Sequence, residues 1–177
     1  DRPANTVYEI FPDGQVTWIG TGKGLAVTAD KGRTFQTYTD LNPGLAETEV
    51  RSVYKTNDET YWIGLTNGLA HGRKSTAKII NSSNSNLQSD TINGITVSDD
   101  GILWLATDAG VSYLKPGEAS FKNINHFSHK QLPEGIVTAV AVDGGIAWIG
   151  TFDNGLYRYE IAGGNVTKVL YDPLRDG

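Results

Sequence analysis

The chain has 177 residues, a net charge of −5 and a hydrophobic content of 38%, which are ordinary values for one globular domain with its own core. Cysteine is absent, which excludes a disulfide framework, a zinc–thiolate site and a cysteine nucleophile. The negative charge argues against nucleic acid or an anionic membrane as a partner, because both attract basic surfaces. Direct membrane insertion is not expected, since no apolar run approaches the ~18 residues of a membrane span.

Four tryptophans divide the chain into four similar copies of a repeat of about 44 residues. They are Trp18, Trp62, Trp104 and Trp148, separated by 44, 42 and 44 residues. The sequence around them reads TWIGT, YWIGL, LWLAT and AWIGT, and six or seven residues after each tryptophan a glycine precedes an apolar residue. Self-similarity at this period is typical of a repeat architecture.

Each copy is predicted to form four antiparallel strands. An apolar run and a turn, often Asp-Gly, favour a hairpin with the strand that carries the tryptophan. The glycine then starts a third strand, and a weaker β-type stretch forms the fourth. In chain order, strands are expected at 7–10, 17–21, 24–28 and 34–39 in the first copy, at 50–54, 61–65 and 77–81 in the second, at 92–97, 103–107 and 121–127 in the third, and at 136–142, 147–151, 155–159 and 166–171 in the fourth. The copies span approximately 6–40, 49–82, 91–127 and 136–171.

The residue two positions after each tryptophan is small: Gly20, Gly64, Ala106 or Gly150. We interpret the tryptophans as structural core residues, and the small residue as the position that a large ring needs when sheets pack face to face. Independent modules of this size would have too small a core. The predicted fold is therefore an all-β β-propeller of four tandem four-stranded antiparallel blades, which forms a single domain or a propeller segment over residues 1–177.

Two copies, DDGILWLATDAGVSYL at 99–114 and GGIAWIGTFDNGLYRYE at 144–160, resemble the repeat of the two-component-regulator propeller family. The first copy departs from the family pattern at Ala26-Val27, and the second at Asn57-Asp58-Glu59. The resemblance covers essentially the whole chain. It implies the extracytoplasmic sensor region of a bacterial regulator, which recognises a ligand such as a carbohydrate and passes the signal through an attached dimeric kinase.

The segment Thr28-Ala29-Asp30-Lys31-Gly32-Arg33-Thr34-Phe35 resembles an Asp-box, a turn found in sialidase-like and related propellers. The resemblance implies a structural role away from catalytic centres. Asp30 would accept local backbone hydrogen bonds, and Gly32 would permit a positive φ.

All four copies run through their strands in the same phase, so no left-over strand at one end completes a blade at the other. The chain starts at Asp1 without Met, as expected of a mature form or an excised domain. We favour a fragment of a longer propeller, or an oligomer, over a closed four-blade monomer. The edges and faces of an open ring attract partners, so self-association or further propeller blades are expected.

No motif in the sequence indicates catalysis or a cofactor. His71, His126 and His129 form no metal-binding pattern. The arginines occupy unlike positions in the repeat, and only Arg51 is well placed for the ring centre, which argues against a sialidase-type arginine cluster.

The loops at 40–49, 82–91 and 128–136 vary between copies while the tryptophan regions do not, which suggests a constant scaffold with variable display loops. Such loops suit hydrogen bonding to a polar small molecule or a glycan. The residues predicted to bind it are polar and open the innermost strands: Glu49, Arg51, Asp90, Asn93 and Thr138.

The predicted function is a non-catalytic sensor or interaction module, located in the periplasm or outside a bacterial cell. Two alternatives stay open. A lyase or glycoside hydrolase acting on polysaccharide would be favoured by a histidine clustered with a glutamate or tyrosine at one funnel mouth. A protein–protein scaffold would be favoured by a large apolar face on the first or last blade.

Overall fold

The computed structural model describes residues 6–37, 48–56, 60–73 and 77–169, and all their regular secondary structure is β. These residues form four separate four-stranded antiparallel sheets, each with its strands in chain order. The predicted all-β fold of four four-stranded blades is thereby confirmed. No helix in these ranges is long and apolar enough to cross a membrane.

The strands follow one another in the order that the repeat predicts. The first sheet holds β1 (Val7–Asp13), β2 (Val16–Thr21), β3 (Gly24–Thr28) and β4 (Gln36–Thr37). The second holds β5 (Val50–Lys55), β6 (Tyr61–Leu65), β7 (Leu69–Gly72) and β8 (Lys78–Ile80). The third holds β9 (Ile92–Val97), β10 (Leu103–Thr107), β11 (Gly110–Leu114) and β12 (Lys122–Ile124). The fourth holds β13 (Val137–Asp143), β14 (Ile146–Thr151), β15 (Leu156–Glu160) and β16 (Asn165–Val169).

Strand β4 begins two residues later than predicted, and β8 and β12 are shorter than the predicted 77–81 and 121–127. Some predicted elements lie outside the described residues. They are most of the turn at 56–58, the strand ends at 38–39 and 170–171, and most of the loop at 40–49.

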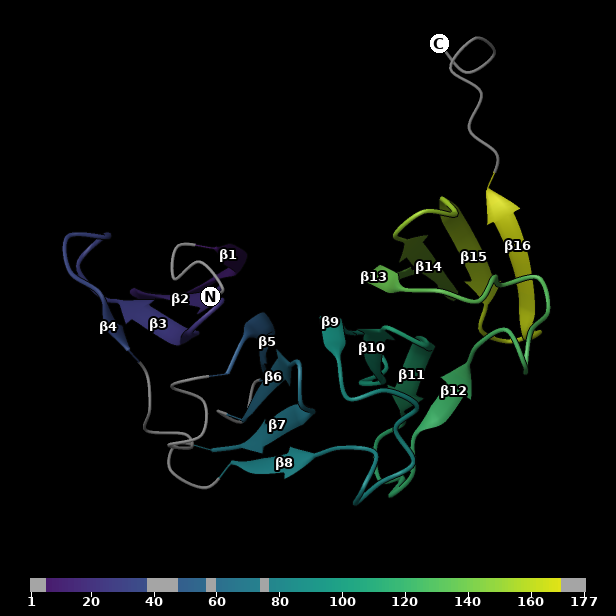
Figure 1. Ribbon diagram of the computed structural model, residues 1–177, viewed down its shortest axis with the longest axis horizontal. Coiled ribbons are helices and arrows are strands. Elements are labelled where there is room, and N and C mark those ends of the chain that lie inside the picture. The colour runs from purple at the N-terminus through teal and green to yellow at the C-terminus, as the bar shows by residue number, and fades with distance from the viewer. Residues whose placement is uncertain (1–5, 38–47, 57–59, 74–76, 170–177) are drawn as a thin grey trace, which may run out of the picture.

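Figure 1 shows the four sheets arranged around an arc, with the first strand of each sheet on the inside and the fourth on the outer rim. Three hydrophobic clusters join the sheets, one for each pair of sequential neighbours. Within the ranges given above, no such cluster joins the first sheet to the fourth, and these two sheets lie at the ends of the arc. The structure is therefore an open arc of blades and differs from a closed four-blade ring.

Three of the four tryptophans pack between sheets: Trp18, Trp62 and Trp104. The ring of Trp18 lies 5.0 Å from that of Tyr61 in the next sheet, and Trp104 lies edge-on to Tyr159 at 6.3 Å. Trp148 does not pack between the described sheets. Its neighbours in β14, Ala147 and Ile149, belong to the hydrophobic cluster that joins the fourth sheet to the third. Alternate residues of a strand point to opposite faces, so Trp148 lies on the face of the last sheet that no described sheet covers.

The small residues that follow the tryptophans were expected to make room for the tryptophan rings, but two of them lie against the backbone or side chain of the next sheet. A Cβ atom at Gly20 would lie 2.7 Å from the backbone oxygen of Val50, and one at Gly64 would lie 2.9 Å from Cγ2 of Ile92. Val50 and Ile92 begin the innermost strand of the next sheet. At Gly20 and Gly64 the absence of a side chain thus admits the neighbouring strand.

The turn between β3 and β4 is built around Asp30. Its carboxylate accepts hydrogen bonds from the backbone N–H groups of Arg33 and Thr34 at 3.0 and 2.9 Å, and from the hydroxyls of Thr28 and Thr34 at 2.9 and 2.6 Å. These bonds, led by the one from the Thr34 hydroxyl, lower the pKa of Asp30 from 3.8 to about 2. Gly32 follows with a φ of 82°, a conformation that glycine adopts readily.

Candidate functional site

The innermost strand of every sheet carries a β-bulge at the same place. In each strand the register of the pairing shifts across one residue, which is Tyr8, Arg51, Asn93 or Thr138. A bulge bends its strand and re-aims the bulged side chain. The repeat therefore presents four different side chains at equivalent positions, one from each sheet.

These four side chains line one hollow of about 410 Å³ on the inside of the arc. The described residues that line it are Tyr8, Arg51, Asn93, Ile136, Thr138 and Phe152. Ile136 precedes β13 and Phe152 follows β14, and both side chains are exposed. Aromatic and apolar walls with a few convergent polar groups are typical of a small-molecule site.

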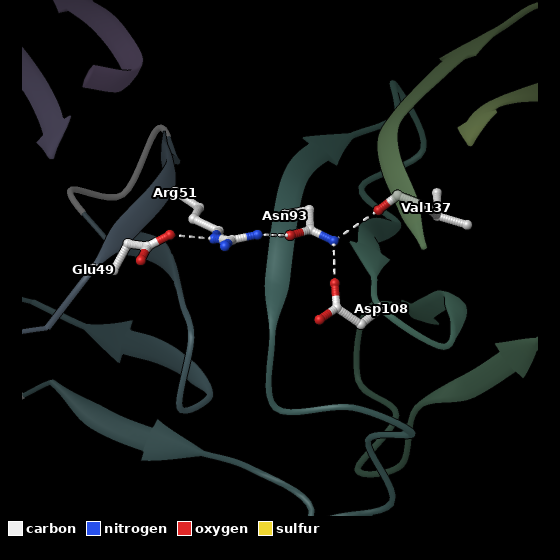
Figure 2. Close-up of polar contacts among 5 residues, drawn as sticks. All are labelled: Glu49, Arg51, Asn93, Asp108 and Val137. Atoms are coloured by element: carbon white, nitrogen blue, oxygen red, sulfur yellow. Dashed lines mark hydrogen bonds and ion pairs between the residues drawn. The ribbon is translucent and has the colours of Figure 1, made fainter. Parts of the chain in front are cut away.

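A chain of polar contacts runs from the second sheet to the fourth, as Figure 2 shows. Arg51 donates from Nε to Oε1 of Glu49 at 2.7 Å, and from Nη1 to Oδ1 of Asn93. Asn93 in turn donates from Nδ2 to Oδ1 of Asp108 at 2.8 Å and to the backbone oxygen of Val137 at 2.9 Å. Each side chain holds the next, so Arg51 and Asn93 are fixed in place before any ligand arrives.

The charges at this hollow leave a small excess of negative charge. Glu49 is buried and forms an ion pair with the partly exposed Arg51, and Asp108 adds a second carboxylate beside Asn93. The guanidinium of Arg51 also lies over the ring of Tyr8, 5.5 Å from its centroid. On the same strand as Tyr8, burial raises the pKa of the Glu9 carboxyl. One guanidinium among carboxylates does not favour an anionic ligand.

Three of the five residues predicted to bind a ligand line the hollow: Arg51, Asn93 and Thr138. Glu49 does not line it but lies behind the arginine and pairs with it. Asp90 lies apart from the hollow, where its Oδ1 accepts a hydrogen bond from the backbone N–H of Ser82 at 2.7 Å. Asp90 therefore ties its own loop together.

The apolar side of the hollow was not among the residues predicted to bind a ligand. Tyr8 follows the first apolar residue of its strand, as Arg51 does in the second copy, so alignment of the four copies at this position would have identified it. Phe152 lies directly after the tryptophan strand, at the place that Asp108 takes in the third copy. Nothing in the sequence sets Ile136 apart.

A second hollow of about 270 Å³ adjoins the loop between β12 and β13, and its lining includes Asp108, His126 and Glu134. The other two histidines pack against aromatic rings, His71 on Trp62 and His129 on Tyr159. Groups of three or more potential metal-ligating side chains do not occur in the described part of the chain. This second hollow is where a histidine and carboxylates come together.

Several solved structures share this fold. The extracellular domain of BT3049, named as a hybrid two-component system of B. thetaiotaomicron, has a TM-score of 0.78 at 21% identity, over 96% of this chain and 25% of that one. The extracellular domain of BT4673 from the same organism has a TM-score of 0.64 at 20% identity, over 93% of this chain and 28% of that one. The chain thus spans about a quarter of the length of each, and at these identities the likeness concerns the fold.

No family model matches the sequence, and no curated protein matches it either.

Proposed function

We propose that the chain is a non-catalytic ligand-binding module of an extracytoplasmic sensor, and that the hollow inside the arc binds a neutral oligosaccharide. The observation that carries this proposal is the convergence of four bulged side chains, one from each sheet, on a single hollow. A repeat that keeps its scaffold constant and varies the one residue aimed at the centre is suited to recognition.

The chemistry of the lining favours a carbohydrate. The CH groups on one face of a sugar ring pack well on aromatic rings, and Tyr8 and Phe152 offer two exposed ones. Sugar hydroxyls both donate and accept hydrogen bonds, as do the amide of Asn93 and the hydroxyl of Thr138. The ion pair of Arg51 with a buried carboxylate leaves no net positive charge, which favours a neutral ligand over an acidic one.

The sensor role rests on analogy. The two structures compared above are extracellular domains of proteins named as two-component systems, and the repeat resembles that of two-component-regulator propellers. By this analogy the chain lies in the periplasm or outside the cell, and ligand binding is passed to a kinase elsewhere in the assembly. The Asp30 turn, which resembles an Asp-box, then has a structural role.

The test is a calorimetric titration of the chain with a panel of neutral and acidic oligosaccharides. We expect a neutral member of the panel to bind, and Phe152→Ala to weaken its binding roughly 2- to 10-fold through loss of the aromatic contact. Phe127→Ala is the matched control, because Phe127 is also highly exposed but lines the second hollow and not this one. Equal losses for both variants would place the ligand elsewhere.

If the chain is instead an enzyme, it would cleave the oligosaccharide added in this titration. A polysaccharide lyase or hydrolase would release new chain ends, and substitution of His126 in the second hollow would abolish their release. A non-catalytic module binds its oligosaccharide and leaves it intact, so the recovery of unchanged ligand separates the two functions.

A further inference from the structure

The second hollow is formed by loops that the sequence analysis assigned to ligand display. Gln88 comes from the loop at 82–91, Glu134 from the loop at 128–136, and Asp108 from the turn between β10 and β11. The hollow has a volume of about 270 Å³, and none of the described residues that line it also lines the hollow inside the arc. It is therefore a separate candidate site, of a size that suits a small ligand.

The side-chain amide of Gln88 brings to this hollow a hydrogen-bond donor that has no acceptor. Oδ1 of Asn125 accepts hydrogen bonds from the backbone N–H groups of Phe127 and Ser128, both at 3.0 Å, so the other amide atom of Asn125 is the donor Nδ2. This Nδ2 donates to Oε1 of Gln88 at 2.8 Å, which identifies the remaining amide atom of Gln88 as Nε2. Nε2 is buried and has no hydrogen-bond partner among the described residues. Because an unpaired buried donor is costly, an oxygen atom of a ligand is the partner that Nε2 lacks.

Two carboxylates give the same hollow a negative charge. They belong to Asp108 and Glu134, which are both exposed, and the described part of the lining contains no lysine or arginine to offset them. Asp108 accepts one hydrogen bond, from Nδ2 of Asn93 at 2.8 Å, and that neutral amide leaves its charge in place. A concave site with this balance of charge attracts a cation.

An aromatic ring stands beside these carboxylates. The side chain of Phe127 is 85% exposed, and its ring is in edge contact with that of His126, with the centroids 5.8 Å apart. An exposed aromatic face next to negative charge favours an organic cation, whose apolar part packs on the ring and whose charge is attracted to it.

A metal ion does not fit the same groups. In the described ranges no three potential metal-ligating side chains come together. The N–H groups of Gln88 Nε2 would also face a metal ion with the wrong polarity, because an amide nitrogen donates and does not coordinate. The ligand must carry a positive charge for the carboxylates and an oxygen atom for the amide.

We infer that the second hollow binds an α-aminoacyl group, which is a protonated amine with a carbonyl on the neighbouring carbon. An amino-acid amide carries this group, and so does the amino terminus of a peptide. The ammonium would lie against the carboxylates of Asp108 and Glu134, and the carbonyl oxygen would accept a hydrogen bond from Nε2 of Gln88. The side chain of the ligand would pack on Phe127. This inference does not rest on the proposed oligosaccharide site, whose lining is different.

The first experiment is a calorimetric titration of the whole chain with three matched compounds, at about pH 6, where an α-amino group is protonated. Phenylalaninamide has both groups and is expected to bind. 2-Phenylethylamine lacks the carbonyl and is expected to bind roughly 2- to 10-fold more weakly. N-acetylphenylalaninamide lacks the charge and is expected to bind roughly 10-fold more weakly or less well still.

A tripeptide with the same amino terminus, phenylalanylglycylglycine, separates the two sources of the group. Tighter binding than that of phenylalaninamide would assign the hollow to peptides. Equal or weaker binding would assign it to free amino-acid compounds.

Two variants test the roles of the named side chains. Glu134→Gln removes one carboxylate and is expected to weaken phenylalaninamide binding roughly 2- to 5-fold. Glu118→Gln is its matched control, because Glu118 is a partly exposed carboxylate outside this hollow. Gln88→Glu keeps an oxygen for Asn125 and replaces the unpaired donor by an acceptor, so it is expected to abolish the preference for phenylalaninamide over 2-phenylethylamine.

Several outcomes would overturn the inference. They are a wild-type chain that binds none of these compounds, equal binding of the acetylated and the free amine, equal losses for the two glutamate variants, and an unchanged preference in Gln88→Glu. Circular dichroism checks that each variant is folded. If Gln88→Glu does not fold, the comparison of phenylalaninamide with 2-phenylethylamine on the wild-type chain still tests the donor.

Discussion

Gly20 and Gly150 occupy equivalent positions in the first and last repeats. We predict that Gly20→Ala destabilises the protein and that Gly150→Ala stabilises it. At Gly20 the added Cβ would lie 2.7 Å from a backbone oxygen of the next sheet. Relief of this contact to an ordinary separation of about 3.5 Å requires the two sheets to move apart by roughly 0.8 Å. At Gly150 the nearest atom is a side-chain carbon at 3.6 Å, and nothing needs to move.

The expected magnitudes follow from these distances. Overpacking of a close interface costs about 1–3 kcal/mol, and replacing glycine by alanine returns about 0.4–1 kcal/mol by restricting the unfolded chain. The net loss for Gly20→Ala is thus about 1–2 kcal/mol, which for a domain of this size lowers Tm by roughly 2–8 °C. Gly150→Ala has only the favourable contribution and is expected to raise Tm by roughly 1–4 °C.

Thermal unfolding followed by far-UV circular dichroism compares the two variants, at concentrations where the chain is monomeric. Gly64→Ala serves as a further control, since a Cβ there would lie 2.9 Å from Ile92, and it is expected to behave like Gly20→Ala. A loss of Tm at Gly150 equal to that at Gly20 would refute the reasoning, because it would show that the glycine is required within its own sheet.

Two further substitutions test the packing and the turn. Trp104→Ala is expected to lower the free energy of unfolding by about 3–5 kcal/mol, because the ring of Trp104 is fully buried between sheets. Trp148→Ala, on the uncovered face, is expected to lower it by less than half as much. Equal losses for the two variants in urea unfolding would contradict the open arc. Asp30 has a pKa lowered to about 2, so its stabilising contribution is complete above its ordinary pKa of 3.8 and is lost as pH falls toward 2. The difference in Tm between wild type and Asp30→Asn should shrink over that range, and a constant difference would contradict the role of the carboxylate.

The blades could be predicted from the sequence because their determinants are local. A hairpin turn, an alternating strand and a tryptophan at a fixed offset each lie within a few residues, and four copies agree on them. The common strand phase of the copies argued against a closed four-blade ring, but the shape of the arc could not be predicted from local patterns. Whether the first and last sheets meet depends on the small rotation between neighbouring sheets, which accumulates over the whole chain and leaves no sign in any one repeat.

Three of the predicted residues lie together in the candidate site because the repeat fixes their direction. Arg51, Asn93 and Thr138 share one position in the strand, and the bulge there aims all three at the hollow. Asp90 has the same polar character but serves its own loop, because a carboxylate near free backbone N–H groups is readily held by them. Polarity alone does not distinguish these two positions. A selection of polar residues also leaves out the aromatic Tyr8, which takes the bulge position in the first repeat.

The most direct test of the proposed function is an NMR titration of the labelled chain with a neutral oligosaccharide, following its amide resonances. The account predicts that the shifts concentrate on the lining of the central hollow, at Arg51, the side-chain amide of Asn93, Thr138 and Phe152, while the turn at 28–34 is unaffected. Shifts centred on the second hollow around His126, or none with any neutral oligosaccharide, would contradict it.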